Sequence, residues 1–155
     1  MSAGILLYRR DRAGLRVLLV HPGGPFWRGR DDGAWSIPKG LVAAGETAEA
    51  AARREFAEEL GTTAAGALSP LGRVRQRGGK WVEAFALEGD FDVAALRSNT
   101  FELEWPPRSG RRTPFPEVDR AEWFTLAEAR VKILDGQREL LDRLEAQLGA
   151  ARERP

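Results

Sequence analysis

The sequence contains no cysteine, a single histidine and no long hydrophobic run. The absence of cysteine excludes disulfides and thiolate metal sites, so a bound metal would have to rely mainly on oxygen ligands. The apolar run near the start of the chain, residues 3–8, is far too short for a signal-peptide core or a membrane span. We therefore expect a cytoplasmic protein without membrane association.

The chain also lacks an excess of either charge. Lys and Arg number 24 against 23 Asp and Glu, which gives a formal charge of +1. This balance gives no general case for a nucleic-acid or membrane surface, so any basic site must be local. With 155 residues and 43% hydrophobic residues the chain can build one core, and we expect a single domain over residues 1–155. The sequence does not indicate an oligomeric state.

Carboxylates crowd together at the end of a glycine-bounded segment, residues 40–61. Thr47 can act as an N-cap, the residues after it are mostly good helix formers, and Gly61 suits the position after the last turn, so a helix is predicted. The crowded acids beside the apolar stripe of this helix are Glu55, Glu58 and Glu59. Like charges three or four residues apart destabilise a helix. The three crowded acids therefore indicate either a site for a hard divalent cation or a solvated acidic face balanced by Arg53 and Arg54.

The same segment resembles the Nudix box, a pattern of Gly, Glu, Arg-Glu, Glu-Glu and Gly at fixed spacing. The matching residues are Gly40, Glu46, Arg54, Glu55, Phe56, Glu58, Glu59 and Gly61. Only the last position departs, because Thr62 stands where the family usually has an aliphatic residue. So many fixed positions over about two dozen residues make the signal highly specific.

The resemblance implies metal-assisted hydrolysis within a diphosphate linkage, with Mg²⁺ as the cofactor and Mn²⁺ as the alternative ion. The metal ligands that it implies are the Gly40 carbonyl, Glu55, Glu58, Glu59 and Glu117. The catalytic residues that it implies are Glu58, Glu55, Arg54, Glu46 and Glu117. In this scheme Glu46 and Arg54 form an ion pair that orients the carboxylates.

Glu117 is the candidate acid beyond the box. In many family members the additional acid lies a few residues before a Trp-containing strand, and Glu117 precedes Trp123 in this way. Its rivals are Glu83, Glu102 and Glu104. The alternative is that Glu117 is an acid of a surface loop after Pro116.

Cations suited to a phosphate lie in two places. Lys39, one of three lysines, directly precedes the box, where its ammonium could reach a phosphate as a point charge. Residues 106–116 form an irregular basic segment in which Arg108 and Arg112, together with Arg111, could fold over an anionic substrate. The alternatives are an ordinary surface lysine and a solvated loop.

Two tryptophans are candidates to stack on a ring of the substrate. Trp35 and Trp27 flank the loop before the box, although a tryptophan near a strand is more often part of the core or a loop anchor. We include Trp35 among the predicted substrate contacts. The single histidine, His21, fits a residue at a strand end better than a catalytic acid or base.

Strand and helix patterns alternate along the chain. Apolar runs predict strands at residues 4–8, 15–20, 35–37, 67–75, 80–87, 101–105 and 121–124. After the box helix, a helix is predicted over residues 126–132, followed by a last helix with Leu140, Leu141, Leu144 and Leu148 at helical spacing. This pattern fits an α/β fold, and the resemblance implies an α/β/α sandwich with a mixed β-sheet.

The motif Trp-Ser-Ile-Pro-Lys-Gly followed by Glu46 is most similar to the branch that cleaves dinucleoside polyphosphates and related phosphoanhydrides. The resemblance therefore implies a small-molecule nucleotide or polyphosphate as the partner, with asymmetric cleavage of a compound such as diadenosine tetraphosphate. The first alternative is a nucleoside triphosphate or nucleotide-sugar pyrophosphohydrolase. The second is a non-catalytic Nudix module that binds nucleotides or RNA.

Overall fold

Successive apolar residues of the first two strands point to opposite faces of the sheet. The residues on each face belong to a separate hydrophobic cluster. In the computed structural model, β1 (Ser2–Asp11) places Leu6 in one hydrophobic cluster and Ile5 in the other. β2 (Gly14–Pro22) divides in the same way, with Leu19 in the first cluster and Leu18 in the second. The sheet therefore has a core on each face, and both faces need helices to cover them.

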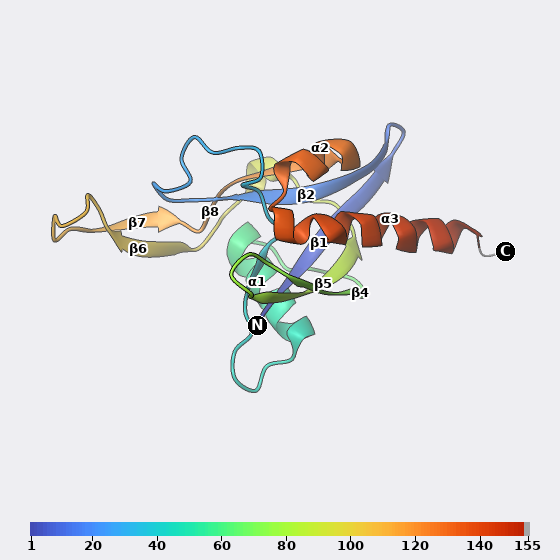
Figure 1. The fold of residues 1–155 in the computed structure, drawn as a ribbon, viewed down its shortest axis with the longest axis horizontal. Coiled ribbons are helices and arrows are strands. Elements are labelled where there is room, and N and C mark those ends of the chain that lie inside the picture. The colour runs from blue at the N-terminus through green and yellow to red at the C-terminus, as the bar shows by residue number, and fades with distance from the viewer. Residues whose placement is uncertain (154–155) are drawn as a thin grey trace.

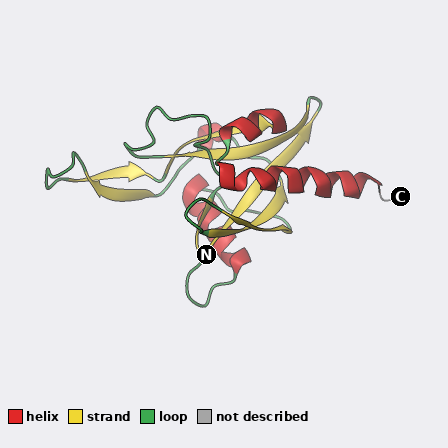
Figure 2. Cartoon of the chain, viewed as in Figure 1, coloured by secondary structure: helices red, strands yellow, loops and turns green. Residues whose placement is uncertain are grey.

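Three helices supply this cover (Figure 1). Helix α1 (Ala48–Leu60) packs Phe56 into the cluster that contains Ile5. On the other face, α2 (Leu126–Lys132) and α3 (Arg138–Glu153) contribute Ala129 and Leu141 to the cluster that contains Leu6. Figure 2 shows the helices on both sides of the strands. The predicted α/β/α sandwich is therefore confirmed.

The main sheet is mixed. Its strand order is β4-β5-β1-β2-β8, with β3 paired to β1 beside this path, and only the β1–β5 pairing is parallel. The remaining strands are β3 (Lys39–Leu41), β4 (Ser69–Arg75), β5 (Trp81–Glu88), β6 (Thr100–Glu104), β7 (Arg112–Pro116) and β8 (Val118–Thr125). Two short 3₁₀ turns are η1 (Val93–Ala95) and η2 (Asp135–Gln137).

A gap between β1 and β2 positions the segment before α1. The two strands pair only near their hairpin, from Tyr8–Val17 to Asp11–Gly14, and separate beyond it. Residues 36–41 fill the opening: Val20 N–H donates to the Ser36 carbonyl at 2.8 Å, and β3 pairs with the start of β1. Because both strands hold this segment, the residues that lead into α1 lie at the centre of the sheet.

Two predicted segments differ from the structure. Residues 35–37 form isolated β-bridges instead of a strand, Trp35 with Ile133 and Ser36 with Val20, and the strand of this region begins at Lys39. Residues 106–116 are not wholly irregular, since β7 pairs with β6 and brings Phe115 opposite Phe101. The prolines of β7 are tolerated because they lie in an isolated two-stranded hairpin, which projects from the main sheet in Figure 1.

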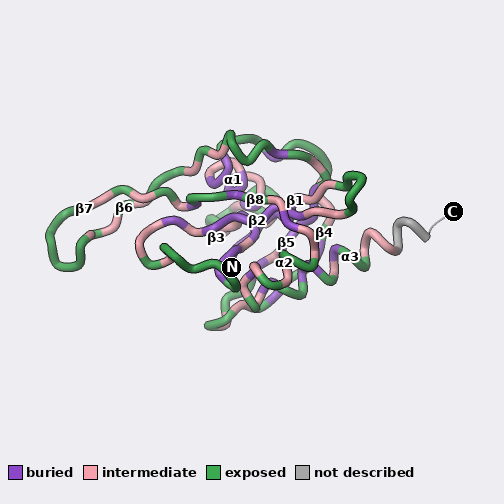
Figure 3. Tube along the Cα trace, turned by 90° about the horizontal axis from the view of Figure 1, so that it is seen from above, coloured by how far each residue is buried: buried purple, intermediate pink, exposed green. Residues whose placement is uncertain are grey.

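The structure describes the backbone of residues 1–153 and the side chains of residues 1–149. The last two residues of the expected domain over residues 1–155 lie outside this description. Figure 3 shows buried residues along the central strands and mostly exposed ones on the projecting hairpin. Within the described part of the chain, no helix combines the length and apolar character that a membrane span requires.

Candidate active site

Helix α1 holds two of its acids against the sheet. The Thr47 hydroxyl accepts a hydrogen bond from Ala50 N–H at 3.1 Å, and Gly61 ends the helix with a φ of 84°, so both predicted caps are confirmed. Glu55 and Glu59 lie one turn apart beside the apolar stripe, and each residue is only 9% exposed. The packing of the stripe therefore draws both carboxylates out of water.

A third acid approaches this pair from the segment between β7 and β8. The Glu117 N–H donates to the Asn99 carbonyl, and the Glu117 carbonyl accepts from Gly23 N–H, both at 2.9 Å. Carboxylate oxygens of Glu55, Glu59 and Glu117 all lie within 4.8 Å of one another. We call these three residues the acid cluster. The structure thus brings Glu117 to the box helix, the position that the family resemblance implies for it.

The rival acids are engaged elsewhere. Glu83 pairs with Arg73 at 2.8 Å, and Glu102 pairs with Arg112 at 3.1 Å on the projecting hairpin. Glu104 accepts a hydrogen bond from Gly110 N–H in the same hairpin.

Burial and mutual repulsion perturb the acid cluster. Burial raises the pKa of Glu59 to about 8, and the charges of Glu55 and Glu117 add to this effect. The pKa values of Glu55 and Glu117 are also raised, again mainly by burial. Three partly desolvated carboxylates at this separation form an all-oxygen donor set of the kind that hard divalent cations take, so the residues fit Mg²⁺.

Arg54 ties the remaining box acids together. Its guanidinium donates to Glu46 at 2.9 and 3.1 Å, to Glu55 at 2.9 Å and to both oxygens of Glu58 at 3.3 Å. A further bond of 2.8 Å reaches the Leu41 carbonyl. The expected Glu46–Arg54 ion pair is therefore present. Glu58 lies one turn after Arg54 on the same helix and contacts its guanidinium. It is not a member of the acid cluster.

Gly40 is a glycine because the Glu55 carboxylate lies against its backbone. A Cβ atom at this position would overlap the carboxylate carbon and both of its oxygens. The neighbouring Lys39 N–H donates to Glu59 at 3.2 Å. β3 therefore brings its backbone into direct contact with the acids of α1.

A cavity of about 180 Å³ opens on the acid cluster. Glu59, Glu117 and Lys39 contribute to its lining, and Trp27 lies among the apolar residues of the wall. Burial lowers the pKa of Lys39, while the charge of Glu59 opposes this change. The cavity thus places one ammonium and one aromatic ring next to the carboxylates.

The sequence profile of the NUDIX domain matches residues 1–144, which is most of the chain. The chain belongs to the Nudix family. Its Nudix box is therefore the segment that supplies Gly40, Arg54, Glu55 and Glu59 to the site described above.

Individual relatives match the chain less completely. An RNA pyrophosphohydrolase of Caulobacter vibrioides is 44% identical over 59 residues, which cover 35% of this chain and 34% of that protein. The match thus spans about a third of the length of this curated relative.

Solved structures with the same fold cover nearly the whole chain. A Caenorhabditis elegans Ap4A hydrolase in a binary complex superposes with a TM-score of 0.68 at 23% identity, over 97% of this chain and 99% of that one. The Nudix domain of Shewanella oneidensis NrtR complexed with ADP ribose gives 0.61 at 18% identity, over 95% and 86%. At these identities the likeness concerns the Nudix fold.

Trp35 is not a substrate contact, and that prediction is wrong. The side chain is only 1% exposed, and its ring packs edge-on against Phe124 with centroids 5.1 Å apart. Its indole N–H donates to Asp31 at 2.8 Å. The ring is therefore a core element of the Nudix domain, and Trp27 is the tryptophan that faces the cavity.

Arg108 and Arg112 are not brought to the acid cluster. Arg112 pairs with Glu102 on the projecting hairpin, and Arg108 is exposed in its turn with a φ of 61°. His21 has a structural place, as expected. Its ring nitrogens lie 2.8 Å from Asp119 Oδ1 and 2.7 Å from the Arg30 carbonyl, and the residue is 2% exposed.

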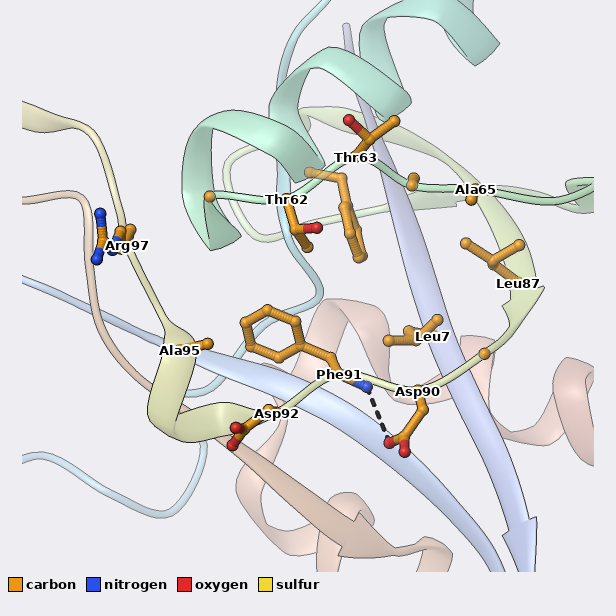
Figure 4. Close-up of a pocket in the computed structure, with 14 residues that line it drawn as sticks. Leu7, Thr62, Thr63, Ala65, Leu87, Asp90, Phe91, Asp92, Ala95 and Arg97 are labelled. Atoms are coloured by element: carbon orange, nitrogen blue, oxygen red, sulfur yellow. Dashed lines mark hydrogen bonds between the residues drawn. The ribbon is translucent and has the colours of Figure 1, made fainter.

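A larger hollow, drawn in Figure 4, lies at the C-terminal end of α1, and none of its lining residues belongs to the acid cluster. It has a volume of about 640 Å³ and is lined by apolar residues such as Leu7 and Phe91, with Thr62 at the end of the helix. Its charged lining residues are Asp90, Asp92 and Arg97, so it carries charges of both signs. Its size exceeds that of the acid-cluster cavity, but it offers no comparable set of metal ligands.

A residue that sequence reasoning missed, Gln137, holds the segment before the Nudix box. Its side chain is fully buried, and its carbonyl accepts from Ile37 N–H at 3.0 Å. Its amide donates to Ser36 at 3.0 Å and to Gln76 at 2.8 Å. Three segments distant in sequence thus meet at one amide, a contact that no local pattern indicates.

We expect Gln137→Leu to lower the free energy of unfolding by about 2 kcal/mol, because the buried Ile37 N–H loses its partner. Urea denaturation followed by circular dichroism measures this change. Gln147→Leu is the matched control, since Gln147 bonds to Ser69 and Pro70 from a half-exposed position where water can replace it. Equal losses in the two variants would contradict the role given to the buried network.

Proposed function

We propose that this chain is a metal-dependent hydrolase that cleaves a phosphoanhydride bond in a nucleoside diphosphate-X substrate. Within this class we propose asymmetric cleavage of a dinucleoside polyphosphate such as diadenosine tetraphosphate. The observation that carries the proposal is the convergence of Glu55, Glu59 and Glu117. Two of these acids, Glu59 and Glu117, line one cavity together with Lys39. Membership of the Nudix family and a fold shared with a C. elegans Ap4A hydrolase support it.

The acid cluster and the Gly40 carbonyl would hold the divalent ion. When bound, such an ion neutralises charge on the phosphate oxygens and helps to position the attacking water. Mg²⁺ suits these oxygen ligands, and Mn²⁺ accepts the same set.

The protein side chains then supply position and proton transfer. Lys39 lies in the cavity wall, where its ammonium can meet a phosphate as a point charge. Arg54 holds Glu55 and Glu58 in fixed positions and is itself held by Glu46. In our proposal a Glu58 carboxylate oxygen accepts the proton of the attacking water as the new P–O bond forms and the anhydride P–O bond breaks.

A second candidate substrate is the 5′-triphosphate end of an RNA. The partial match to an RNA pyrophosphohydrolase of C. vibrioides favours it, because that match is 44% identical over 59 residues. An RNA end presents the same chemistry as the first candidate, a nucleotide carrying phosphoanhydride bonds. A nucleoside triphosphate or nucleotide sugar is the further alternative with this chemistry.

The products separate these candidates. With diadenosine tetraphosphate and MgCl₂ we expect ATP and AMP in equal amounts by ion-exchange chromatography, and no products when EDTA replaces MgCl₂. Release of pyrophosphate from triphosphate-ended RNA or from nucleoside triphosphates, with diadenosine tetraphosphate left intact, would reassign the substrate. Tight nucleotide binding without hydrolysis of any of these compounds, in Mg²⁺ or Mn²⁺, would instead indicate a non-catalytic module.

A further inference from the structure

Exposed apolar side chains gather at the end of the sheet that carries β3. Met1, Leu41 and Trp81 are 50%, 68% and 46% exposed, and they are three of the six large hydrophobic residues described as exposed. All three line one hollow of about 380 Å³. We call this hollow the Trp81 pocket. Because isolated surface hydrophobics are ordinary but a shared concave patch is not, it is a candidate binding site.

The Trp81 pocket is bordered by positive charge. Arg73 and Lys80 line it, and the Arg75 guanidinium lies 6.0 Å from the centroid of the Trp81 ring. Arg73 is paired with Glu83, whereas no ion pair of Lys80 is found within the described part of the chain. An aromatic face beside free positive charge suits a ring that carries an anion.

The strand register links the Trp81 pocket to the acid cluster. Ser2 of β1 lies between Leu41 of β3 and Val82 of β5, the residue after Trp81. Leu41 and Trp81 therefore lie on either side of β1 at one end of the sheet. Their strands are two strand spacings apart, about 10 Å. Along β3, Lys39 lines the acid-cluster cavity and Leu41 lines the Trp81 pocket. The two hollows are therefore lined by residues two positions apart on one strand, about 7 Å along the chain.

We propose that the Trp81 pocket binds a nucleobase of the substrate, while its phosphates extend along Lys80 and Lys39 toward the acid cluster. This inference rests on the proposed function, because it assigns a place to the nucleoside part of the same substrate. The base stacks on the exposed indole face, an interaction open to any base because every base has a π-face. Leu41 and Met1 complete the apolar walls.

Binding in EDTA tests the pocket without requiring hydrolysis. The probes are ATP, which carries a base, and inorganic tripolyphosphate, which does not. In ¹H–¹⁵N spectra the indole N–H signal of Trp81 is the one missing from Trp81→Phe. We expect ATP to shift this signal, tripolyphosphate to leave it in place, and Trp81→Ala to bind ATP about tenfold more weakly than the wild type does.

The control variant is Val131→Ala, which removes another exposed apolar side chain, from α2, and should bind ATP as the wild type does. Trp81→Phe should retain most of the affinity, because phenylalanine also stacks. Unchanged ATP binding by Trp81→Ala would overturn the inference even if the enzyme cleaves nucleotides. A Trp81 shift that depends on protein concentration alone would also overturn it, because the pocket would then be a contact between two copies. Base-dependent binding in a protein without hydrolase activity would uphold the pocket and reject only the proposed catalysis.

Discussion

Glu59→Gln is expected to lower kcat by about a thousandfold while the protein keeps its fold. Glu59 is a buried member of the acid cluster, and its carboxylate accepts a hydrogen bond from Lys39 N–H at 3.2 Å. Glutamine keeps the shape and the bond-accepting oxygen but lacks the negative charge that a divalent ion requires. Initial rates at saturating MgCl₂, with circular dichroism for the fold, measure the effect.

Glu122→Gln is the matched control. Glu122 lies on β8 with its side chain 47% exposed and makes only a 4.0 Å contact with Arg120, so its activity should remain within a factor of about two of wild type. If Glu59→Gln retained activity close to that of Glu122→Gln, the acid cluster would not be the metal site. A loss confined to KM would likewise contradict a role in the chemical step.

Glu59 also makes the stability of the metal-free protein depend on pH. Its pKa is about 8 in the folded state against 4.5 as the ordinary value, so the unfolded chain releases this proton first as the pH rises. Below pH 4.5 the carboxyl is protonated in both states and costs nothing. Between pH 4.5 and 8 the free energy of unfolding falls, and above pH 8 the whole contribution, a few kcal/mol, is lost. The raised pKa values of Glu55 and Glu117 act in the same direction.

Urea denaturation in EDTA at pH 5.5 and 8.5 tests this linkage. The wild type should be less stable at pH 8.5, and Glu59→Gln should lose much less stability between the two pH values. MgCl₂ should stabilise the wild type more at pH 8.5 than at pH 5.5, because the ion competes with protons for the carboxylates. Equal pH dependence in wild type and Glu59→Gln would show that the carboxyl is not buried as described.

Local patterns predicted the box helix and much of the acid site. Thr47, Gly61 and the spacing of Glu55 and Glu59 are all determined within about four helical turns, so short-range rules reach them. Glu117 was predicted by resemblance alone, because nothing in its neighbourhood indicates that it meets α1. Its position depends on hydrogen bonds to Asn99 and Gly23, which are set by the tertiary fold.

The errors arose where distant residues decide exposure. Trp35 precedes the box and looks available to a substrate, but Phe124 and His21 pack against its ring and bury it. Gln137 gave no sequence signal because its partners lie 61 and 100 residues away. The β6–β7 hairpin was hidden by its prolines, which argue against a strand in a central position but not in an isolated ribbon.

Gly40→Ala is expected to lower kcat by about a hundredfold, although the substitution adds only one methyl group. The new Cβ would occupy the space of the Glu55 carboxylate, so that side chain must leave its place between Gly40 and Arg54. A displacement of about 1 Å at a group that positions the reaction is enough for such a loss. Because the overlap also strains the packing of β3 against α1, we expect about 1 to 3 kcal/mol of destabilisation.

Gly149→Ala is the control for this substitution, because a Cβ at Gly149 in α3 meets no atom within 4 Å. It should leave activity unchanged and stabilise the helix by up to about 1 kcal/mol. Isothermal titration of Mg²⁺ into both variants separates the two effects of the Gly40 substitution, since displacement of Glu55 must weaken metal binding whereas simple destabilisation need not. Wild-type kcat and metal affinity in Gly40→Ala would mean that Glu55 does not need the position against the Gly40 backbone that the structure gives it.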